Sequence, residues 1–355
     1  MWNKNLLKYT TIFSMVIVFI GCQTDNMDSP LNINEIDIID LKDIELMIDF
    51  EEYGLIMPWQ IEISQDGRIF VLDIQTNHVL IFGLDGNLIH RFGGQGRGPG
   101  EFIGARYLQI SDNKVYIIDI NLLRINVFNH SGEFLQAFHF DTGMSRRIVT
   151  VMDEETYFAA AMGRDGKLIR KVHSHSDSTL SFGESLGIEF QPGNMDFERR
   201  KLQQGEIPDL FKNEITMYYS NNYLYVFLNA YSRIQKYDQD GNLVWDQSVI
   251  LPINEIIFGN VVERAQEPGA TGTVPDIQYI TSMKAYYESL FLFWVPVDGY
   301  PRQLVKTDSN GNVVLIYRVP ESEPMFFDFT VDKENDMLYL IAPEMGQIYR
   351  ASIPN

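Results

Sequence analysis

The sequence is poor in several residue types, and each shortage excludes a class of protein. It has one cysteine, Cys22, in 355 residues, so an internal disulfide is excluded. Lysine and arginine number 28 against 48 aspartates and glutamates, which gives a formal net charge of −20. Nucleic-acid binding needs a basic surface for the phosphates, and an acidic protein is also repelled by anionic lipid. We therefore expect no nucleic-acid partner.

Short catalytic motifs are scarce as well. The chain has no H-E-x-x-H and no C-x-x-C motif, and we expect no serine nucleophile elbow. A catalytic site can still assemble from residues that lie far apart in the sequence. The scarcity therefore leaves catalysis open and gives it no support.

Long apolar runs are missing too, and the one near the N-terminus is short. Residues 12–20 are apolar apart from Ser14, follow two lysines, and precede Gly21-Cys22. A membrane span needs about 20 apolar residues, so this run reads as a targeting signal. The segment Phe19-Ile20-Gly21-Cys22 resembles a bacterial lipobox. The resemblance implies a signal peptide over residues 1–21 and lipid attachment at Cys22; an ordinary secretory signal or an uncleaved anchor is the alternative.

This resemblance also implies a location in the cell envelope, with the membrane as a partner through lipidated Cys22. Asp25 and Asp28 resemble the outward-export signal of some Gram-negative lineages. We expect an outer-membrane or cell-surface lipoprotein, with a periplasm-facing one as the alternative. Residues 22–43 begin with a polar stretch that contains one proline, and we interpret them as the lipidated cysteine and a flexible tether.

Beyond the tether, the sequence repeats a four-strand pattern. Residues 58–104 contain four short apolar runs, each closed by a turn signal such as Gln65-Asp66-Gly67 or Asp85-Gly86. Four short strands joined by tight turns predict one antiparallel sheet. One such sheet cannot bury both of its faces, so it needs copies of itself.

Further units of the same kind begin near residues 105, 148, 214, 277 and 325. The last unit has three strands, and residues 44–50 precede the first unit with the spacing of the missing fourth strand. Pairing of these two segments would close a ring and remove exposed sheet edges. We therefore predict an all-β six-bladed β-propeller over residues 44–355. A seventh blade hidden in residues 185–213 is the alternative.

The glycine-rich segment that runs from Phe92 to Phe102, FGGQGRGPGEF, is the best family motif. It resembles the NHL-type six-bladed propellers, and among them a group of bacterial propeller lipoproteins. Asp73 and Asp119 occupy equivalent positions at the ends of second strands, which favours a structural role in accepting backbone N–H groups. Most members of this lipoprotein group have no assigned activity, so the resemblance implies the fold and leaves the function open.

Loop lengths indicate where a site would lie. Residues 93–101, 185–213 and 251–276 each connect a fourth strand to the next first strand, and the last two are unusually long. Helical patterns cover residues 196–204 and 254–266, with Asn194 or Asn254 as a cap. We expect all three segments to gather over one mouth of the central channel, as lids of a binding site.

Aromatic and basic side chains near that mouth are the candidate ligand-binding residues. They are Trp59, Gln60, Arg97, Arg106, Tyr107, Arg146 and Arg147. Arginine and aromatic side chains suit a carboxylated, glycan or peptide ligand, or an envelope protein. Pairing of these arginines with nearby acids is the plainer interpretation.

A metal site is the alternative reading of the channel. Six-bladed lactonases and lyases, which this fold resembles, hold a metal ion with Glu, Asn, Asp or His at the channel. Glu62 and Asp328 lie on first strands, but Gln109 and Tyr218 replace the equivalents of Glu62, so no such constellation is found. His173 and His175 have a chelating spacing but fall at the end of a third strand.

We therefore predict no cofactor and no catalytic residue, with a divalent cation as the alternative. The leading hypothesis is an envelope lipoprotein whose propeller is a non-catalytic binding or interaction module. The second hypothesis is a metal-dependent lactonase or lyase of the six-bladed type.

Overall fold

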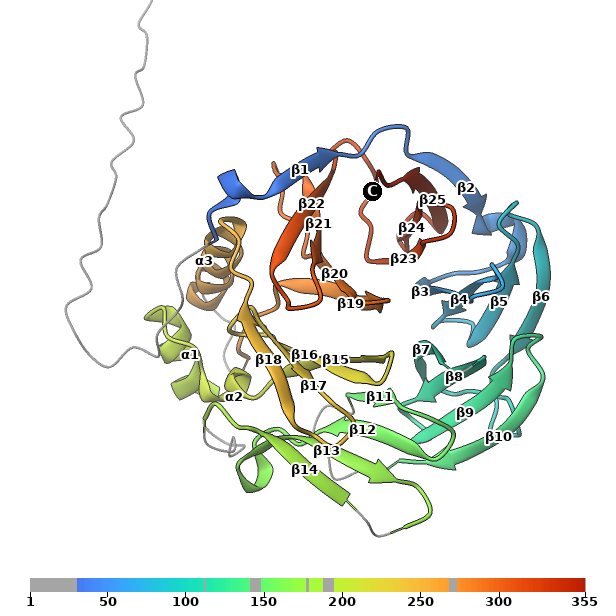
Figure 1. The fold of residues 1–355 in the computed structure, drawn as a ribbon, viewed down its shortest axis with the longest axis horizontal. Helices are drawn as coiled ribbons and strands as arrows, with labels where there is room; N and C mark the ends of the chain where they lie inside the picture. The colour runs from blue at the N-terminus through green and yellow to red at the C-terminus, as the bar shows by residue number, and fades with distance from the viewer. Residues whose placement is uncertain are drawn as a thin grey trace, which may run out of the picture.

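The computed structural model describes residues 31–354, except 112, 141–147, 177–178, 188–194 and 268–272. Six antiparallel sheets stand around a common axis like the blades of a propeller (Figure 1). The predicted fold class is therefore confirmed. The predicted signal peptide, Cys22, Arg146 and Arg147 lie outside the described residues.

The first blade has the four strands that its apolar runs predicted. They are β3 (Pro58–Ile63), β4 (Ile69–Asp73), β5 (His78–Phe82) and β6 (Leu88–Gly93). Gly67 and Gly86, at φ of 76° and 83°, supply the left-handed backbone of the turns β3–β4 and β5–β6. The strand β3 lies innermost and β6 outermost (Figure 1).

The next three blades repeat this order. Blade two has β7 (Ala105–Ser111), β8 (Lys114–Asp119), β9 (Arg124–Asn129) and β10 (Phe134–His139). Blade three has β11 (Val149–Val151), β12 (Thr156–Ala160), β13 (Lys167–His173) and β14 (Thr179–Glu184). Blade four has β15 (Ile215–Ser220), β16 (Tyr223–Leu228), β17 (Arg233–Tyr237) and β18 (Leu243–Ser248).

The last two blades each recruit a strand from the N-terminal side. Blade five has β19 (Ile280–Tyr286), β20 (Ser289–Trp294), β21 (Arg302–Thr307) and β22 (Val313–Val319). Blade six has β23 (Asp328–Asp332), β24 (Met337–Ala342), β25 (Gln347–Ser352) and, as its fourth strand, β2 (Glu45–Asp49). The antiparallel pairing of β2 with β25 is the ring closure predicted for residues 44–50.

A further strand, β1 (Asp37–Asp40), falls within the segment predicted as tether. It adds to the outer edge of blade five, parallel to β22, and Arg318 pairs with Asp40 across the two strands (Nε–Oδ1 2.6 Å). The tether boundary at residue 43 was therefore placed too late, because paired structure begins before it. A short 3-10 helix, η1 (Ile33–Glu35), precedes β1.

Asp73 and Asp119 have the structural role that their repeated position indicated. The Asp73 carboxylate accepts the backbone N–H groups of Ile56 and Met57, which precede β3, and of Gln75 and Thr76 in the following turn. Asp119 does the same in blade two. Each buried carboxylate therefore fastens the segment leading into its blade to the turn after its second strand.

The glycine-rich segment is a crossing between blades one and two, followed by the strand β7. Gly93 has φ 87°, and a Cβ at this position would lie 2.5 Å from the Phe102 ring. The Arg124 guanidinium donates to the carbonyls of Arg97, Gly98 and Glu101. The crossing is therefore held by hydrogen bonds from the Arg124 side chain to its backbone carbonyls.

The long segments contain helices α1 (Met195–Gln203), α2 (Asp209–Lys212) and α3 (Ile253–Gln266). Because α1 and α2 form where a seventh blade would need strands, that alternative is wrong. Asn254 was wrong as a cap, since its Oδ1 accepts the indole N–H of Trp294 inside the helix (2.9 Å). No helix in the described part of the chain is both long and apolar enough to cross a membrane.

These helices do not form lids over the channel. Figure 1 shows α1, α2 and α3 at the outer edge of the disc, beyond β18 and β22 and away from the innermost strands. Their apolar side chains Leu202, Phe211 and Val261 join the core between blades four and five. The expectation that both long segments cover the mouth is therefore wrong for their described parts.

The Asp73 contacts lead to a first prediction. Asp73→Ala leaves four backbone donors without their acceptor, so we expect a loss of roughly 3–5 kcal/mol in the free energy of unfolding. Urea denaturation measures this loss. Asp85→Ala is the control, because Asp85 is an exposed turn carboxylate, and it should cost less than about 1 kcal/mol. Equal losses for the two variants would contradict the assigned role.

Candidate functional site

The candidate site lies where the innermost strands begin. In each blade the first strand lines the channel, and all six first strands start at the same end, here called the channel mouth. Three of these strands have a β-bulge close to their start. The residues left unpaired by the register shifts are Trp59 in β3, Arg106 in β7 and Thr281 in β19. Bulges re-aim side chains and are frequent beside binding sites.

Two of the bulged residues meet in a cluster, here called the mouth cluster, of Trp59, Arg106, Tyr107 and Phe327. The Trp59 and Phe327 rings lie 5.4 Å apart, and the Arg106 guanidinium lies 4.7 Å from the centroid of Trp59. All four side chains are partly exposed. Burial raises the pKa of the Tyr107 hydroxyl, and the neighbouring Arg106 charge offsets part of this effect. Blades six, one and two thus contribute to one surface.

Below the mouth, the channel contains a buried ionic network, here called the axial network, of Glu62, Ser282, Lys284 and Asp328. The Lys284 Nζ lies 3.2 Å from Glu62 Oε1 and 3.1 Å from Asp328 Oδ2, and it also donates to the carbonyl of Ile61. Ser282 donates its hydroxyl to Asp328 Oδ1. The side chains of Lys284, Glu62 and Asp328 are at most 5% exposed. The network therefore joins blades five, six and one on the axis.

Burial shifts the pKa of Glu62 in this network and of two tyrosines whose pKa also responds to the Glu62 charge. Removal from water raises the pKa of Glu62 to about 7, because the Lys284 ammonium only partly offsets the desolvation and Asp328 adds repulsion. Burial also raises the pKa of the Tyr218 and Tyr286 hydroxyls well above their ordinary value, and the Glu62 charge adds to both shifts. Both tyrosines are therefore neutral hydroxyls at physiological pH.

Hydrogen bonds between neighbouring first strands continue around the whole channel. Each of the six blade interfaces has such a bond: Leu108 N to Gln60 Oε1 (2.7 Å), Val151 N to Gln109 Oε1 (2.8 Å), Tyr219 N to Thr150 Oγ1 (3.2 Å), Ser220 Oγ to Ala285 O (3.4 Å), Val331 N to Tyr286 OH (3.1 Å) and Ile61 N to Asp328 Oδ2 (2.9 Å). Side chains that line the channel therefore fix the blades to one another. The mouth consequently rests on a rigid base.

The structure divides the predicted ligand-binding residues. It brings Trp59, Arg106 and Tyr107 together. The side-chain carbonyl of Gln60 instead accepts a hydrogen bond from the backbone N–H of Leu108. Arg97 is exposed on the glycine-rich crossing, away from the cluster. Sequence reasoning missed Phe327 and Lys284. A lysine flanked by apolar residues in a first strand was the available signal for Lys284.

The metal alternative depends on the oxygen atoms around the axis. Glu62, Asp328 and the carbonyl of Ile61 converge on one point, but the Lys284 ammonium occupies it. Among the residues that the structure describes, no group of three or more His, Cys, Asp or Glu side chains could hold a metal ion. His173 pairs instead with Glu155 at the end of β13 (Nε2–Oε2 3.5 Å). The donor set around Lys284 therefore fits an ammonium group already supplied by the chain.

A serine motif is present after all, as G-x-S-x-G spacing over residues 183–187. Ser185 directly follows the outermost strand β14, and its backbone N–H donates to Gly166 O (3.0 Å). A nucleophile elbow instead places its serine at the end of a central strand. The spacing is therefore no sign of a hydrolase here.

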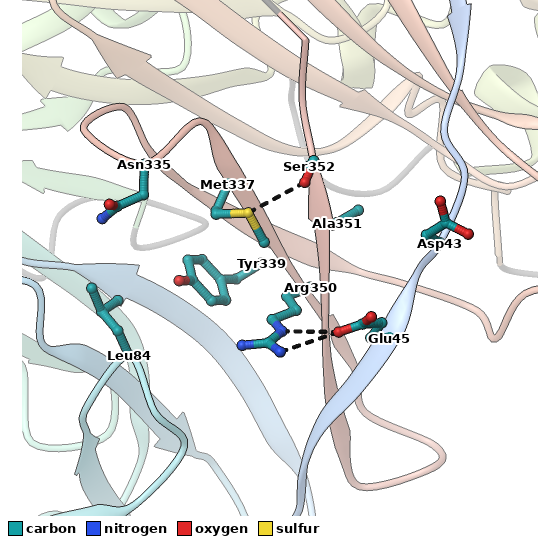
Figure 2. A pocket seen from close by; sticks show the side chains of 9 residues that line it. All are labelled: Asp43, Glu45, Leu84, Asn335, Met337, Tyr339, Arg350, Ala351 and Ser352. Carbon is teal, nitrogen blue, oxygen red and sulfur yellow. Dashed lines mark hydrogen bonds and ion pairs between the residues drawn. The ribbon is translucent and has the colours of Figure 1, made fainter.

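A shallow pocket of about 460 Å³ lies at the face opposite the mouth, between blades six and one (Figure 2). Leu84 and Asn335 line it from the turns β5–β6 and β23–β24. Arg350 is its cationic group, and Figure 2 shows this side chain directed at Glu45, with which it pairs (NH2–Oε2 3.1 Å). Because its charge is already neutralised, this pocket is a weaker candidate than the mouth cluster.

Six blades of four antiparallel strands, with β1 added to blade five and the ring closed by β2, define the class of protein, a six-bladed β-propeller. In agreement, a family described as "6-bladed beta-propeller" (DUF5128) matches residues 37–204. No protein with a curated description matches the sequence.

Solved structures with the same fold share little sequence with this chain. A putative exported protein from Bacteroides fragilis is 12% identical, with a TM-score of 0.55 over 90% of this chain and all of its own. A catalytically inactive virginiamycin B lyase from Staphylococcus aureus, solved with quinupristin, is 11% identical, with a TM-score of 0.50 over 88% of this chain and 100% of its own. At these identities the likeness concerns the fold alone.

The raised pKa of Glu62 predicts how stability depends on pH. Unfolded Glu62 loses its proton near pH 4.5, whereas the folded protein keeps it to about pH 7. The folded state thus binds more protons in this window, and the free energy of unfolding falls as pH rises. Relative to Glu62→Gln, wild type should lose up to about 3 kcal/mol between pH 4.5 and 7.

Urea denaturation of both proteins at several pH values measures this difference. Glu344→Gln is the control, since Glu344 is exposed on the turn between β24 and β25, and the Glu62→Gln difference should change with pH more than the control difference does. A flat difference for Glu62→Gln would contradict the assigned titration.

Proposed function

We propose that the protein is a cell-envelope lipoprotein of the NHL-like type whose propeller binds a ligand or partner without catalysis. The binding site is the mouth cluster. The observation that carries this proposal is the placement of Trp59 and Arg106 in bulges, where they stack on one another and remain partly exposed. Exposed arginine and aromatic side chains that are held together are typical of binding surfaces.

The base of the site supports a binding role. The axial network and the circle of hydrogen bonds around the channel hold the strands from which the cluster projects. A ligand that meets side chains already in place loses less conformational freedom on binding. Such preorganisation favours recognition at the mouth over a site formed by the exposed crossing around Arg97.

The axial network favours binding over the metal-dependent lactonase or lyase. Such an enzyme needs carboxylates that are free to bind a metal ion. Here the carboxyl groups of Glu62 and Asp328 both lie against the Lys284 ammonium, and their side chains are only 5% exposed. Replacing that ammonium with a metal ion would require the lysine side chain to leave a buried site.

The proposed localisation in the cell envelope rests on the sequence around Cys22. Cys22→Ser removes the thiol that would carry the lipid, so we expect the variant to move from the membrane fraction to the soluble fraction of cells. Immunoblotting of both fractions, together with metabolic labelling by an alkyne fatty acid, measures this change. Ser14→Ala, within the same apolar run, is the control and should stay in the membrane fraction. Retention and labelling of the Cys22→Ser protein would contradict lipidation at this residue.

Substitutions test binding at the mouth cluster separately from binding at the helices on the outer edge of the disc, here called the rim. We expect the double variant Trp59→Leu with Arg106→Gln to weaken binding at least about tenfold in a screen of envelope glycans and peptides, because both contact groups are lost. Biolayer interferometry against the immobilised panel measures the affinities.

Phe197→Ser is the matched control, because Phe197 is 42% exposed on α1 at the outer edge. It should bind as wild type does. Unchanged binding by the mouth variant, with loss in the rim variant, would move the site to the helices. Circular dichroism confirms that both variants remain folded.

A further inference from the structure

We propose that the mouth cluster recognises a ligand with a single carboxylate beside an apolar group, and that Arg106 is the carboxylate receptor. This inference rests on the function proposed above and names the ligand chemistry of the same site. It follows from three observations: Arg106 has no acidic partner among the described residues, its guanidinium stacks on Trp59, and exposed apolar residues lead into β3.

The first observation is that Arg106 has no acidic partner among the residues that the structure describes. Four other arginines have one: Arg68 pairs with Asp66, Arg233 with Asp246, Arg318 with Asp40 and Arg350 with Glu45. Arg106 differs from these four in being partly exposed at the channel mouth with no carboxylate of the described residues to offset its charge. Its guanidinium interacts with the Tyr107 hydroxyl, and its five N–H donors leave others that can donate to a carboxylate from outside.

The second observation is that Trp59 serves as a support for Arg106. One neighbour of the indole ring is Phe327, at 5.4 Å with 34° between the rings, and another is the Arg106 guanidinium, at 4.7 Å. Stacking on an aromatic ring fixes the plane of a guanidinium and leaves the N–H groups at its edge available. A planar carboxylate can bind such an edge through two parallel hydrogen bonds.

The third observation concerns the apolar groups close by. Ile56 and Met57 directly precede β3, and they are 66% and 39% exposed. Their backbone N–H groups are held by Asp73, so the two side chains are presented from a fixed turn. Exposed aliphatic side chains that precede Trp59 by two and three residues suit a ligand that carries an apolar group next to its charge.

The net charge narrows the ligand further. A chain of charge −20 repels polyanions such as acidic polysaccharides, and the repulsion grows with the charge of the ligand. Among anionic ligands, one with a single carboxylate experiences the least repulsion and still makes the contact with Arg106. The carboxyl terminus of a peptide that ends in an apolar residue has this chemistry, and so does a fatty acid.

Fluorescence polarisation with a short peptide tests the inference. The probe is N-terminally labelled Gly-Gly-Ala-Leu-Phe with a free carboxyl terminus, and its partner is the same peptide with a terminal amide. We expect wild type to bind the acid at least tenfold more tightly than the amide. Arg106→Gln should remove that preference, and Arg106→Lys should restore it in part, because lysine keeps the charge but not the planar edge.

Arg97→Gln is the matched control, an exposed arginine that was also a candidate, and it should keep the preference of wild type. Competition by dodecanoate tells the two sources apart. Displacement of the acid by dodecanoate at an equal or lower concentration assigns the site to fatty acids, and weaker displacement assigns it to peptide termini. Both results agree with the proposed chemistry.

Three results would overturn it: equal affinity for acid and amide, equal loss in the Arg97 and Arg106 variants, or no binding of either probe up to about 1 mM. Equal affinity that is lost in Trp59→Leu would refute the carboxylate and leave the proposed binding role standing. If neither peptide binds while wild type still binds members of the envelope panel, the carboxylate specificity is likewise refuted and the proposed binding role stands.

Discussion

The Lys284 ammonium on the propeller axis is the interaction on which much else depends. It projects from blade five, donates to carboxylates of blades six and one, and thereby ties together the blades at which the ring closes. The closing strand β2 makes the same junction at the outside of the disc. Ring closure is thus secured twice, by buried charge at the centre and by backbone hydrogen bonds at the edge. Removing one member of such a buried set would leave another charge uncompensated.

The axial network also explains why the channel acts as a rigid support, while the candidate binding surface lies at its mouth. A buried ionic group contributes little net stability compared with a well-packed apolar core, but it permits only one arrangement of its partners. The hydrogen bonds around the channel extend this constraint to every blade. At the mouth, the β-bulges leave Trp59 and Arg106 outside the strand pairing, and both side chains are partly exposed.

Much of the fold could be predicted from sequence because turn chemistry is local. Asp-Gly and Asn-Gly pairs mark the hairpins, and the repeated Asp73 and Asp119 mark equivalent strand ends. The strand β1 was missed because four residues, two of them acidic, lack the alternation of a half-buried strand. The helices were predicted, but sequence gives the length of a loop and not its direction, so their place at the outer edge was not foreseen.

The candidate site could be predicted only in part, for a related reason. Trp59, Arg106 and Tyr107 follow from strand register, since they lie at the starts of first strands. The roles of Phe327 and Lys284 depend on contacts with blades that are distant in sequence. Lys284, for example, pairs with Glu62, more than two hundred residues away in the chain. Such contacts depend on how the ring closes, and no local pattern encodes that closure.

The place where the chain joins the disc has a consequence for its position. The described chain begins at the outer edge, where Leu31 N donates to Ile250 O (2.8 Å) and β1 continues along blade five (Figure 1). If Cys22 is anchored in a lipid leaflet, the nine peptide steps to Leu31 span at most about 30 Å. The edge of the disc at which Leu31 meets blade four would then lie within that distance of the membrane, whichever way the disc is tilted.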